Sequence, residues 1–186
     1  MCDTDARDRG LLSVEVGNIG IKDMRRSQKV PIAPYGQVSD YVPFYFAPRS
    51  PMMFSISKGN VPTYSGGTAR LVYLVTSLER LTEQGHTPVL TDRNAALRYA
   101  AYRRFDAADE IDDGFIDWDV MKAKYWGDFD DGRERRMAEA LVHENVEWAC
   151  ILSVTAQSEI VAEEARAMIS AAKSTVRVKV VPQWYF

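Results

Sequence analysis

Residues 39–67 read SDYVPFYFAPRSPMMFSISKGNVPTYSGG and place one arginine, Arg49, between two prolines in an apolar and aromatic segment. A guanidinium group is costly to bury unless an anion or hydrogen-bond acceptors meet it. Arg49 is therefore either a charge at the edge of a loop or a group that its surroundings present. Pro48 and Pro51 stiffen the backbone on both sides, as the presentation of one side chain requires.

The composition is that of an ordinary globular chain. Its 186 residues, 46% hydrophobic and 26% charged, predict one domain spanning residues 1–186 with a sizeable core. The net charge of −3 gives no general attraction to nucleic acid. Two distant cysteines predict a reducing compartment. With no apolar segment of membrane-spanning length and no signal peptide in MCDTDARDRG, we expect a cytoplasmic protein.

Hydrophobic patterning predicts an α+β fold around a mixed or antiparallel sheet, because the strands outnumber the helices and do not alternate regularly with them. Strands are expected at residues 11–16, 42–47, 70–77, 88–91, 148–156 and 175–181. Helices are expected at residues 93–105 behind an Asp92 cap, at residues 116–126 capped by Asp117 or Asp119, and at residues 158–173.

The segment RERRMAEALVHENVEW, residues 133–148, fits two structures. Met137, Ala140 and Leu141 would share one face of a helix, which slightly favours a helix, but a charged loop leading into the strand EALV also fits. Glu139 is flanked directly by apolar residues on both sides. A partly desolvated glutamate near cations can act as a base or stabilise positive charge, although a glutamate on a helix surface fits the pattern as well.

Other chemical motifs are weak or absent from the sequence. His86 and His143 have no partner at metal-ligand spacing, so no metal site is predicted. There is no G-x-S-x-G, G-x-G-x-x-G or P-loop. Arg98 and Tyr102 in LRYAAYRRF combine basic and aromatic side chains, which is typical of single-strand binding but equally of a solvated basic helix. The acidic segment at residues 106–119 is expected to be a solvated loop and helix start.

Several strings together resemble the DarT family of bacterial DNA ADP-ribosyltransferase toxins. They are residues 39–67, VYLVTSLERL, TDRNAALRY, IDWDVMKAKYW, RRMAEALV and the terminal VRVKVVPQWYF. The resemblance implies an ADP-ribosyltransferase fold of two small, mostly antiparallel sheets with peripheral helices and an NAD cleft between the sheets. It implies transfer of ADP-ribose from NAD to a base of single-stranded DNA that is typically thymine. The implied partner is a DarG antitoxin whose macrodomain removes the modification.

The resemblance also assigns candidate site residues. The essential arginine of the family corresponds to Arg25 in IKDMRR, with Arg26 as the fallback, and the catalytic glutamate corresponds to Glu139, which makes AEALV a strand. The segment matching FYFAPRSPM lines the NAD cleft, so Tyr45, Arg49, Ser50 and Met52 are expected to bind NAD. For Arg49, a structural tie between the strand end and a neighbouring loop is the alternative. Asn94 and Arg133 are expected to contact DNA.

Further expectations concern the N-terminal segment, the alternative functions and the surroundings of Glu139. Family members usually begin with an H-x-T-H-like strand, and MCDTDARDR occupies that place here, so we expect that adding such a strand would strengthen NAD binding. A catalytically silent module that binds single-stranded DNA or a protein is the alternative function, and an enzyme that labels protein or RNA is a third. We expect the Glu139 carboxylate to face an open cleft and to form no buried pair with Arg135 or Arg136.

Overall fold

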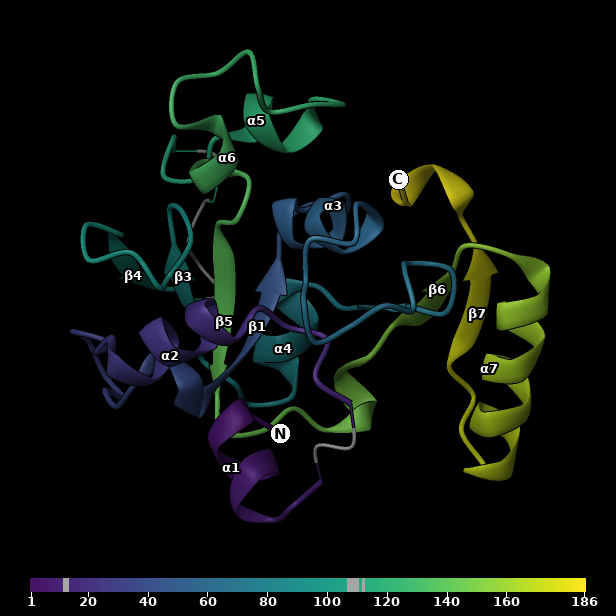
Figure 1. Cartoon of the computed structure of the whole chain (residues 1–186). Coiled ribbons are helices and arrows are strands. Elements are labelled where there is room, and N and C mark those ends of the chain that lie inside the picture. Colours follow the sequence, from purple (N-terminus) through teal and green to yellow (C-terminus); the bar gives the residue numbers. More distant parts are fainter. Residues whose placement is uncertain (12–13, 107–110, 112) are drawn as a thin grey trace.

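The computed structural model describes residues 1–11, 14–106, 111 and 113–186, and its strands form two small sheets (Figure 1). The four-stranded sheet has the order β1-β5-β3-β4 and is antiparallel throughout. The three-stranded sheet has the order β2-β6-β7, with β6 and β7 parallel. The strands are β1 (Tyr41–Tyr45), β2 (Tyr73–Val75), β3 (Val89–Thr91), β4 (Tyr102–Arg104), β5 (Glu139–His143), β6 (Ser153–Ala156) and β7 (Arg177–Val180). The expected fold class, with two mostly antiparallel sheets, is confirmed.

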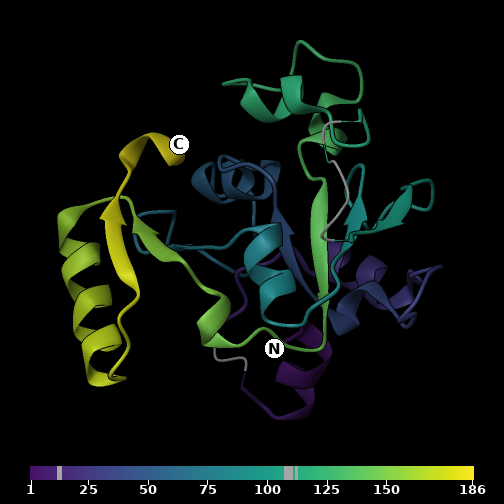
Figure 2. The ribbon, with the colours of Figure 1, turned by 180° about the vertical axis from the view of Figure 1, so that it is seen from behind.

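Short helices surround the two sheets. They are α1 (Asp3–Asp8), α2 (Ile19–Ser27), α3 (Pro51–Ser57), α4 (Leu78–Glu83), α5 (Trp118–Lys122), α6 (Gly132–Arg135) and α7 (Glu159–Ala171), with 3-10 turns η1 (Val38–Asp40), η2 (Trp148–Cys150) and η3 (Pro182–Trp184). Figure 2 shows α7 along β7, on the side away from the four-stranded sheet. Among the described residues, no helix combines the length and the apolar character that a bilayer crossing requires.

β5 forms the centre of the four-stranded sheet. β1 and β3 pair with its two edges, and its first four residues are buried. Leu141 packs in a cluster with Val38, Tyr41 and Val89, while Ala140 packs in a second cluster that contains Leu90. Because β5 is covered on both faces and paired on both edges, its position and that of its first residue, Glu139, are fixed by the core.

The helix prediction for residues 93–105 is wrong, and so is the slight preference for a helix over residues 133–148, because in both segments tertiary pairing overrides the helical period. Residues 93–105 form turns followed by β4, because the Asp92 carboxylate accepts a hydrogen bond from the Ala101 backbone and closes the loop. Residues 133–148 form the short helix α6 and then β5, because β1 and β3 supply partners for an extended chain. The strand reading of AEALV is confirmed.

Most of the other predicted elements are present with shifted bounds. The helix α5 begins after Asp117, whose side chain accepts from Val120 N as expected of an N-cap, and α7 and β7 lie where they were predicted. The strands predicted at residues 70–77 and 148–156 are confirmed only over β2 and β6. The strand predicted at residues 11–16 includes residues 12 and 13, which lie outside the described part, and described residues 11 and 14–16 are not in a strand. Likewise, residues 107–110 and 112 of the acidic segment lie outside the described part.

Candidate active site

A buried ion pair joins the first residue of β5 to the last turn of α2. Nη1 of Arg25 lies 2.9 Å from both carboxylate oxygens of Glu139. The Arg25 side chain is 14% exposed and that of Glu139 is 0% exposed. The two residues are 114 positions apart in the sequence, so only the fold brings them together.

The sheet holds the backbone of Glu139 on both sides. On β1, Tyr45 lies directly opposite Glu139 in the antiparallel register. On the other side, the Glu139 backbone N–H donates to Oγ1 of Thr91, the last residue of β3, at 3.1 Å. The Thr91 hydroxyl in turn donates to the backbone carbonyl of Arg93 at 2.7 Å. The carboxylate therefore projects from a rigid strand, as a preorganised catalytic group should.

The expectation that Glu139 faces an open cleft is wrong. Its carboxylate is fully buried beneath the guanidinium of Arg25. As expected, it forms no pair with the neighbouring arginines: Arg135 pairs with Asp117 at 2.9 Å, and Arg136 binds backbone carbonyls. Both arginines precede β5, on α6 and at its C-terminal cap, and their side chains are taken by these other partners.

Two tyrosines complete the surroundings of the pair. Burial, reinforced by the negative charge of Glu139, raises the pKa of the Tyr45 hydroxyl far above its ordinary value. Burial also raises the pKa of Tyr102 to about 12. Burial opposes the charge of Arg25, but the carboxylate of Glu139 outweighs it and raises the pKa of the guanidinium. The two phenols beside the ion pair are therefore neutral at neutral pH.

Arg25 also has unused hydrogen-bonding capacity. Its Nη2 is buried and has no hydrogen-bond partner among the described residues. A buried donor without a partner is costly, so such an atom fits a place where a ligand acceptor arrives. Arg26, the fallback candidate, instead faces the acidic side chains of Asp23 and Asp3.

Arg49 is tied to the C-terminal residues. Its Nη1 donates to the backbone carbonyl of Tyr185 at 2.5 Å, and its guanidinium lies 4.1 Å from the ring centroid of Phe186. Its backbone N–H donates to the Tyr73 hydroxyl at 3.2 Å, and that hydroxyl donates to the carbonyl of Trp184. This arrangement matches the structural alternative for Arg49, a tie that links the end of β1 to the three-stranded sheet.

We expect Arg49→Met to lower the free energy of unfolding by about 1.5–3 kcal/mol, the usual contribution of a hydrogen bond to a charged group. Chemical denaturation measures this change. The matched control is Lys122→Met, which removes an exposed cation of α5 and should leave stability within about 0.5 kcal/mol. Equal stability of the Arg49 and Lys122 variants would contradict the structural role.

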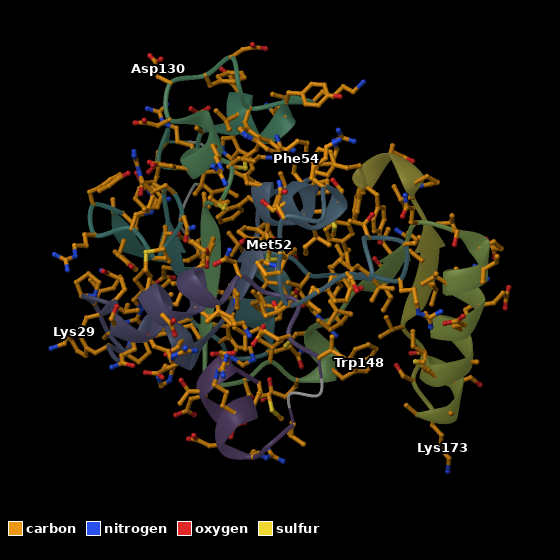
Figure 3. The ribbon with its side chains drawn as sticks, viewed as in Figure 1. Lys29, Met52, Phe54, Asp130, Trp148 and Lys173 are labelled. Atoms are coloured by element: carbon orange, nitrogen blue, oxygen red, sulfur yellow. The ribbon has the colours of Figure 1, made fainter. Side chains whose placement is uncertain are left out.

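The other expected NAD contacts lie on two elements. Tyr45 is beside Glu139, as described above. Ser50 is buried, and its hydroxyl caps α3 by accepting a hydrogen bond from Met53 N at 3.2 Å. Met52 is 42% exposed on α3, and Figure 3 labels it together with Phe54 of the same helix. Among the described residues, no hydrogen bond or ion pair joins Arg49, Ser50 or Met52 to Glu139, so Tyr45 alone of these four residues is brought to the pair.

The two expected DNA contacts differ in accessibility. Asn94 is 5% exposed, and its side chain is used within its own loop, where Oδ1 accepts from Ala96 N at 3.0 Å. Its backbone N–H donates to the carbonyl of Glu134, so this loop is joined to α6. Arg133 is exposed on α6. Asn94 is therefore placed to shape the loop, and Arg133 is placed on the surface.

Sequence reasoning missed the role of Arg136. This residue is 2% exposed and donates to the carbonyls of Val120, Ala123 and Pro48 at 2.6–2.8 Å. Burial and the nearby charge of Arg49 lower its pKa. Arg136 thus joins α5 to the proline-flanked loop. Arg49 and Arg136 line a cavity of about 660 Å³ together with Lys122, Lys124 and Tyr185. None of the residues that line this cavity is acidic.

Comparison with known proteins identifies the fold. The structure of Thermus sp. 2.9 DarT in complex with ADP-ribosylated ssDNA matches with a TM-score of 0.86 at 32% identity, covering 94% of this chain and 82% of that chain. The complex of the same protein with NAD+ matches with a TM-score of 0.80 at 34% identity, covering 88% and 81%. Together with the two sheets and the buried arginine–glutamate pair, this match defines an ADP-ribosyltransferase-like protein.

Sequence comparison identifies the family. A family model described as "ssDNA thymidine ADP-ribosyltransferase, DarT" matches residues 1–186. The DNA ADP-ribosyl transferase of Thermus sp. (strain 2.9) is 35% identical over 168 residues, which are 89% of this chain and 78% of the relative. That of Mycobacterium tuberculosis is 30% identical over 180 residues, or 94% and 76%. The chain belongs to the DarT family, as the sequence motifs predicted.

Proposed function

We propose that this chain transfers ADP-ribose from NAD to thymidine in single-stranded DNA. Membership of the DarT family over the whole chain supports this reaction, as do the related structures with NAD+ and with ADP-ribosylated ssDNA. The observation that carries the proposal is the buried ion pair that Arg25 of α2 forms with Glu139 at the start of the rigid strand β5. Charged groups that are buried from solvent can stabilise developing charge strongly, because little solvent screens them.

In this proposal Glu139 is the catalytic carboxylate. NAD supplies a ribose carbon that gains positive charge as nicotinamide leaves. The negative charge of Glu139 stabilises that carbon, and the same carboxylate can accept the proton from the attacking thymine nitrogen. The base must be unpaired to reach a carboxylate at this depth, which accounts for a single-stranded substrate.

Arg25 positions the carboxylate and receives the substrate. Its Nη1 holds both oxygens of Glu139, while its buried Nη2 lacks a partner among the described residues and is suited to an acceptor oxygen of NAD. The residues present therefore fit the substrate at this atom. Tyr45, beside Glu139, is proposed to contact NAD with its neutral hydroxyl. Arg49, Ser50 and Met52 remain proposed NAD contacts on the basis of the family motif.

Substrate access requires α2 to shift, because a fully buried carboxylate cannot touch a ribose. No residue of α2 is buried, so the helix is held by few core contacts. We propose that α2 shifts outward when NAD binds, far enough to expose Glu139 to the ribose but with Arg25 still in reach of the carboxylate and of NAD. For DNA, we propose that the exposed Arg133 contacts the strand, and that Asn94 acts by holding its loop against α6.

The test is a labelling assay with a thymine-containing single-stranded oligonucleotide and labelled NAD. We expect the single strand to gain ADP-ribose and the matching duplex to remain unlabelled, because the duplex hides the base. An oligonucleotide of the same length without thymine is the control. Equal labelling of single strand and duplex, or labelling of protein alone, would contradict the proposal. Binding of the single strand without any labelling would favour a silent DNA-binding module.

The proposed partner and location follow the family resemblance. A DarG-type macrodomain antitoxin would remove ADP-ribose from the labelled oligonucleotide, and the reaction would take place in the cytoplasm, where single-stranded DNA and NAD are available. Incubating the labelled oligonucleotide with such a macrodomain should release the label, whereas a macrodomain with a blocked ADP-ribose pocket should not.

A further inference from the structure

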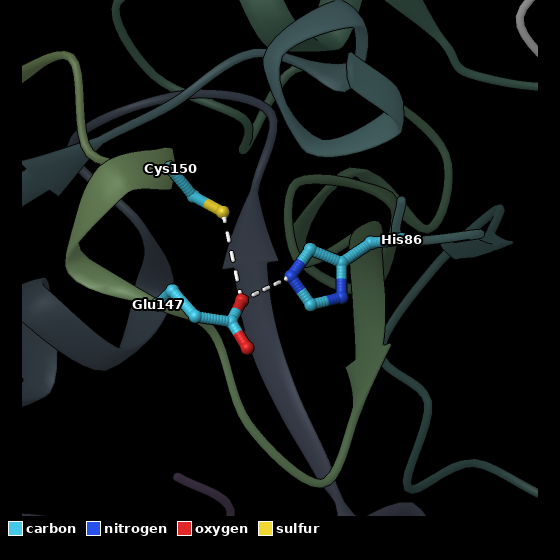
Figure 4. A group of neighbouring side chains, drawn as sticks. All are labelled: His86, Glu147 and Cys150. Carbon is cyan, nitrogen blue, oxygen red and sulfur yellow. Dashed lines mark hydrogen bonds and ion pairs between the residues drawn. The ribbon is translucent and has the colours of Figure 1, made fainter. Parts of the chain in front are cut away.

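A second cluster of chemically active side chains lies away from the Arg25–Glu139 pair. His86, Glu147 and Cys150 meet with their ligand-type atoms within 4.8 Å of one another. Nε2 of His86 lies 2.7 Å from Oε2 of Glu147, and Sγ of Cys150 lies 4.0 Å from the same oxygen. Figure 4 shows the carboxylate between the thiol and the imidazole.

Two separate connections supply these residues. His86 follows α4, where its backbone N–H donates to the carbonyl of Leu81 at 3.0 Å. Glu147 precedes η2 and Cys150 ends it, so one 3-10 turn presents both side chains three positions apart. His86 lies 61 residues before Glu147. The sequence spacing therefore gave no sign of the cluster, because these neighbours of His86 are brought together only by the fold.

The arrangement does not suit nucleophilic catalysis by the cysteine. A catalytic thiol needs an imidazole that can take its proton directly. Here the imidazole is hydrogen-bonded to Glu147, and the polar atom near the thiol is also a carboxylate oxygen of Glu147. The set of one imidazole, one carboxylate and one thiol is instead a donor set that zinc prefers.

We propose that His86, Glu147 and Cys150 bind one Zn²⁺ ion, through Nε2, a carboxylate oxygen and the thiolate Sγ, with water as the fourth ligand. Binding releases the thiol proton to solvent, because the thiolate is the ligand form. Zinc bonds of ~2.0–2.3 Å in a tetrahedral site place ligand atoms ~3.3–3.8 Å apart. When zinc binds, the distance between His86 Nε2 and Glu147 Oε2 must therefore increase from 2.7 Å, and the distance between Cys150 Sγ and that oxygen must decrease from 4.0 Å.

The burial pattern allows this adjustment. The side chain of Glu147 is 58% exposed, whereas that of His86 is 16% exposed and Cys150 is 0% exposed. The imidazole and the thiol are therefore held in place by the surrounding core, whereas the exposed carboxylate is free to change its position. An ion can enter from solvent beside Glu147 without disturbing the core.

The expected role of the ion is structural. α4 lies in the connection from β2 to β3, and η2 lies in the connection from β5 to β6, so each connection crosses between the two sheets. A bound zinc ion would therefore link the β2–β3 connection to the β5–β6 connection. Cys150 packs against Leu81 and against Val142 near the end of β5. Val142 is three residues from Glu139, or about 10 Å along a strand, so the ion would lie outside the transfer site.

The experiment uses the metal-free full chain titrated with Co²⁺, which occupies zinc sites and reports its ligands by absorption. We expect one Co²⁺ per chain, a thiolate-to-cobalt charge-transfer band, the intense visible bands of tetrahedral cobalt, and loss of both when Zn²⁺ displaces it. We also expect the Tm to rise with Zn²⁺. At one hundred times the Kd, the unfolding equilibrium constant should fall about 100-fold.

The other buried cysteine provides a matched control. Cys150→Ser should remove the charge-transfer band and the zinc-dependent Tm shift, whereas Cys2→Ser should keep both. Because Cys150 lies in the core and its variant can be unstable, His86→Asn and Glu147→Gln provide more exposed tests, and each should weaken binding at least tenfold. Absence of a thiolate band in the unsubstituted chain, or a band that survives in Cys150→Ser, would overturn the proposal.

Discussion

Glu139→Gln is expected to slow transfer of ADP-ribose to single-stranded DNA about 10²–10³-fold, the usual cost of losing one preorganised electrostatic stabiliser. The amide keeps the shape of the side chain and an oxygen that can accept from Arg25 Nη1, but it loses the negative charge. NAD binding should be largely retained, because the charge of Glu139 matters most as positive charge develops on the ribose. Single-turnover transfer and NAD titration on the same preparation measure the two effects.

The control for this variant is Glu144→Gln, which removes an exposed carboxylate just beyond the other end of β5. It should leave transfer within about twofold, since surface substitutions rarely disturb a distant site. Unchanged transfer in Glu139→Gln would remove Glu139 from the mechanism. A loss of transfer that only follows a loss of folded protein would assign Glu139 a structural role.

The burial of the pair changes what an alanine variant can show. With Glu139 in an open cleft, Glu139→Ala would cost little stability. In the structure the same change leaves the Arg25 guanidinium, 14% exposed, without its counter-charge. Removing one partner of a buried pair typically costs about 3–5 kcal/mol. Glutamine also removes the counter-charge, but it keeps the volume and an acceptor oxygen for Arg25, so it should cost less stability than alanine and is the better test of chemistry.

Local sequence patterns predicted the elements whose structure is decided locally. Asp117 caps α5 and Ser158 caps α7 with their side chains, and the alternating residues of β7 pair with β6. Similar signals were present but unused at two further helices: Asn18 caps α2, and Ser50 caps α3 with proline following it. A cap followed by a short helix is visible in the sequence, even where the hydrophobic period is too short to measure.

The site itself could be predicted only in part. The family motifs placed Arg25 and Glu139 as candidates, but no local pattern indicates that residues 114 positions apart form a buried pair. The same limit applies to Arg136, whose carbonyl partners lie on α5, at its C-terminal cap and in the proline-flanked loop. Long-range contacts depend on how the two sheets pack, and local patterns in a single sequence carry no information about that packing.

The second large effect is expected for Arg25→Met, which fills a similar volume but removes the positive charge. The Glu139 carboxylate, 0% exposed, would then be a buried charge without a counter-charge. We expect the free energy of unfolding to fall by about 3–5 kcal/mol, and transfer to be lost as well. Chemical denaturation and the oligonucleotide assay measure these effects. Arg26→Met is the matched control, because Arg26 is the next residue of α2 and is half-buried. This variant should lower the free energy of unfolding far less than Arg25→Met.

The double variant Arg25→Met/Glu139→Gln separates stability from chemistry. It removes both charges at once, so no charge is left uncompensated, and a buried pair replaced by neutral groups often costs little. We expect the double variant to be more stable than Arg25→Met alone, with a coupling of about 0.5–3 kcal/mol between the two sites, while transfer stays absent. Recovery of stability without recovery of activity would show that the pair is retained for the reaction. Additive losses of stability would contradict the pairing, because independent residues cannot rescue each other.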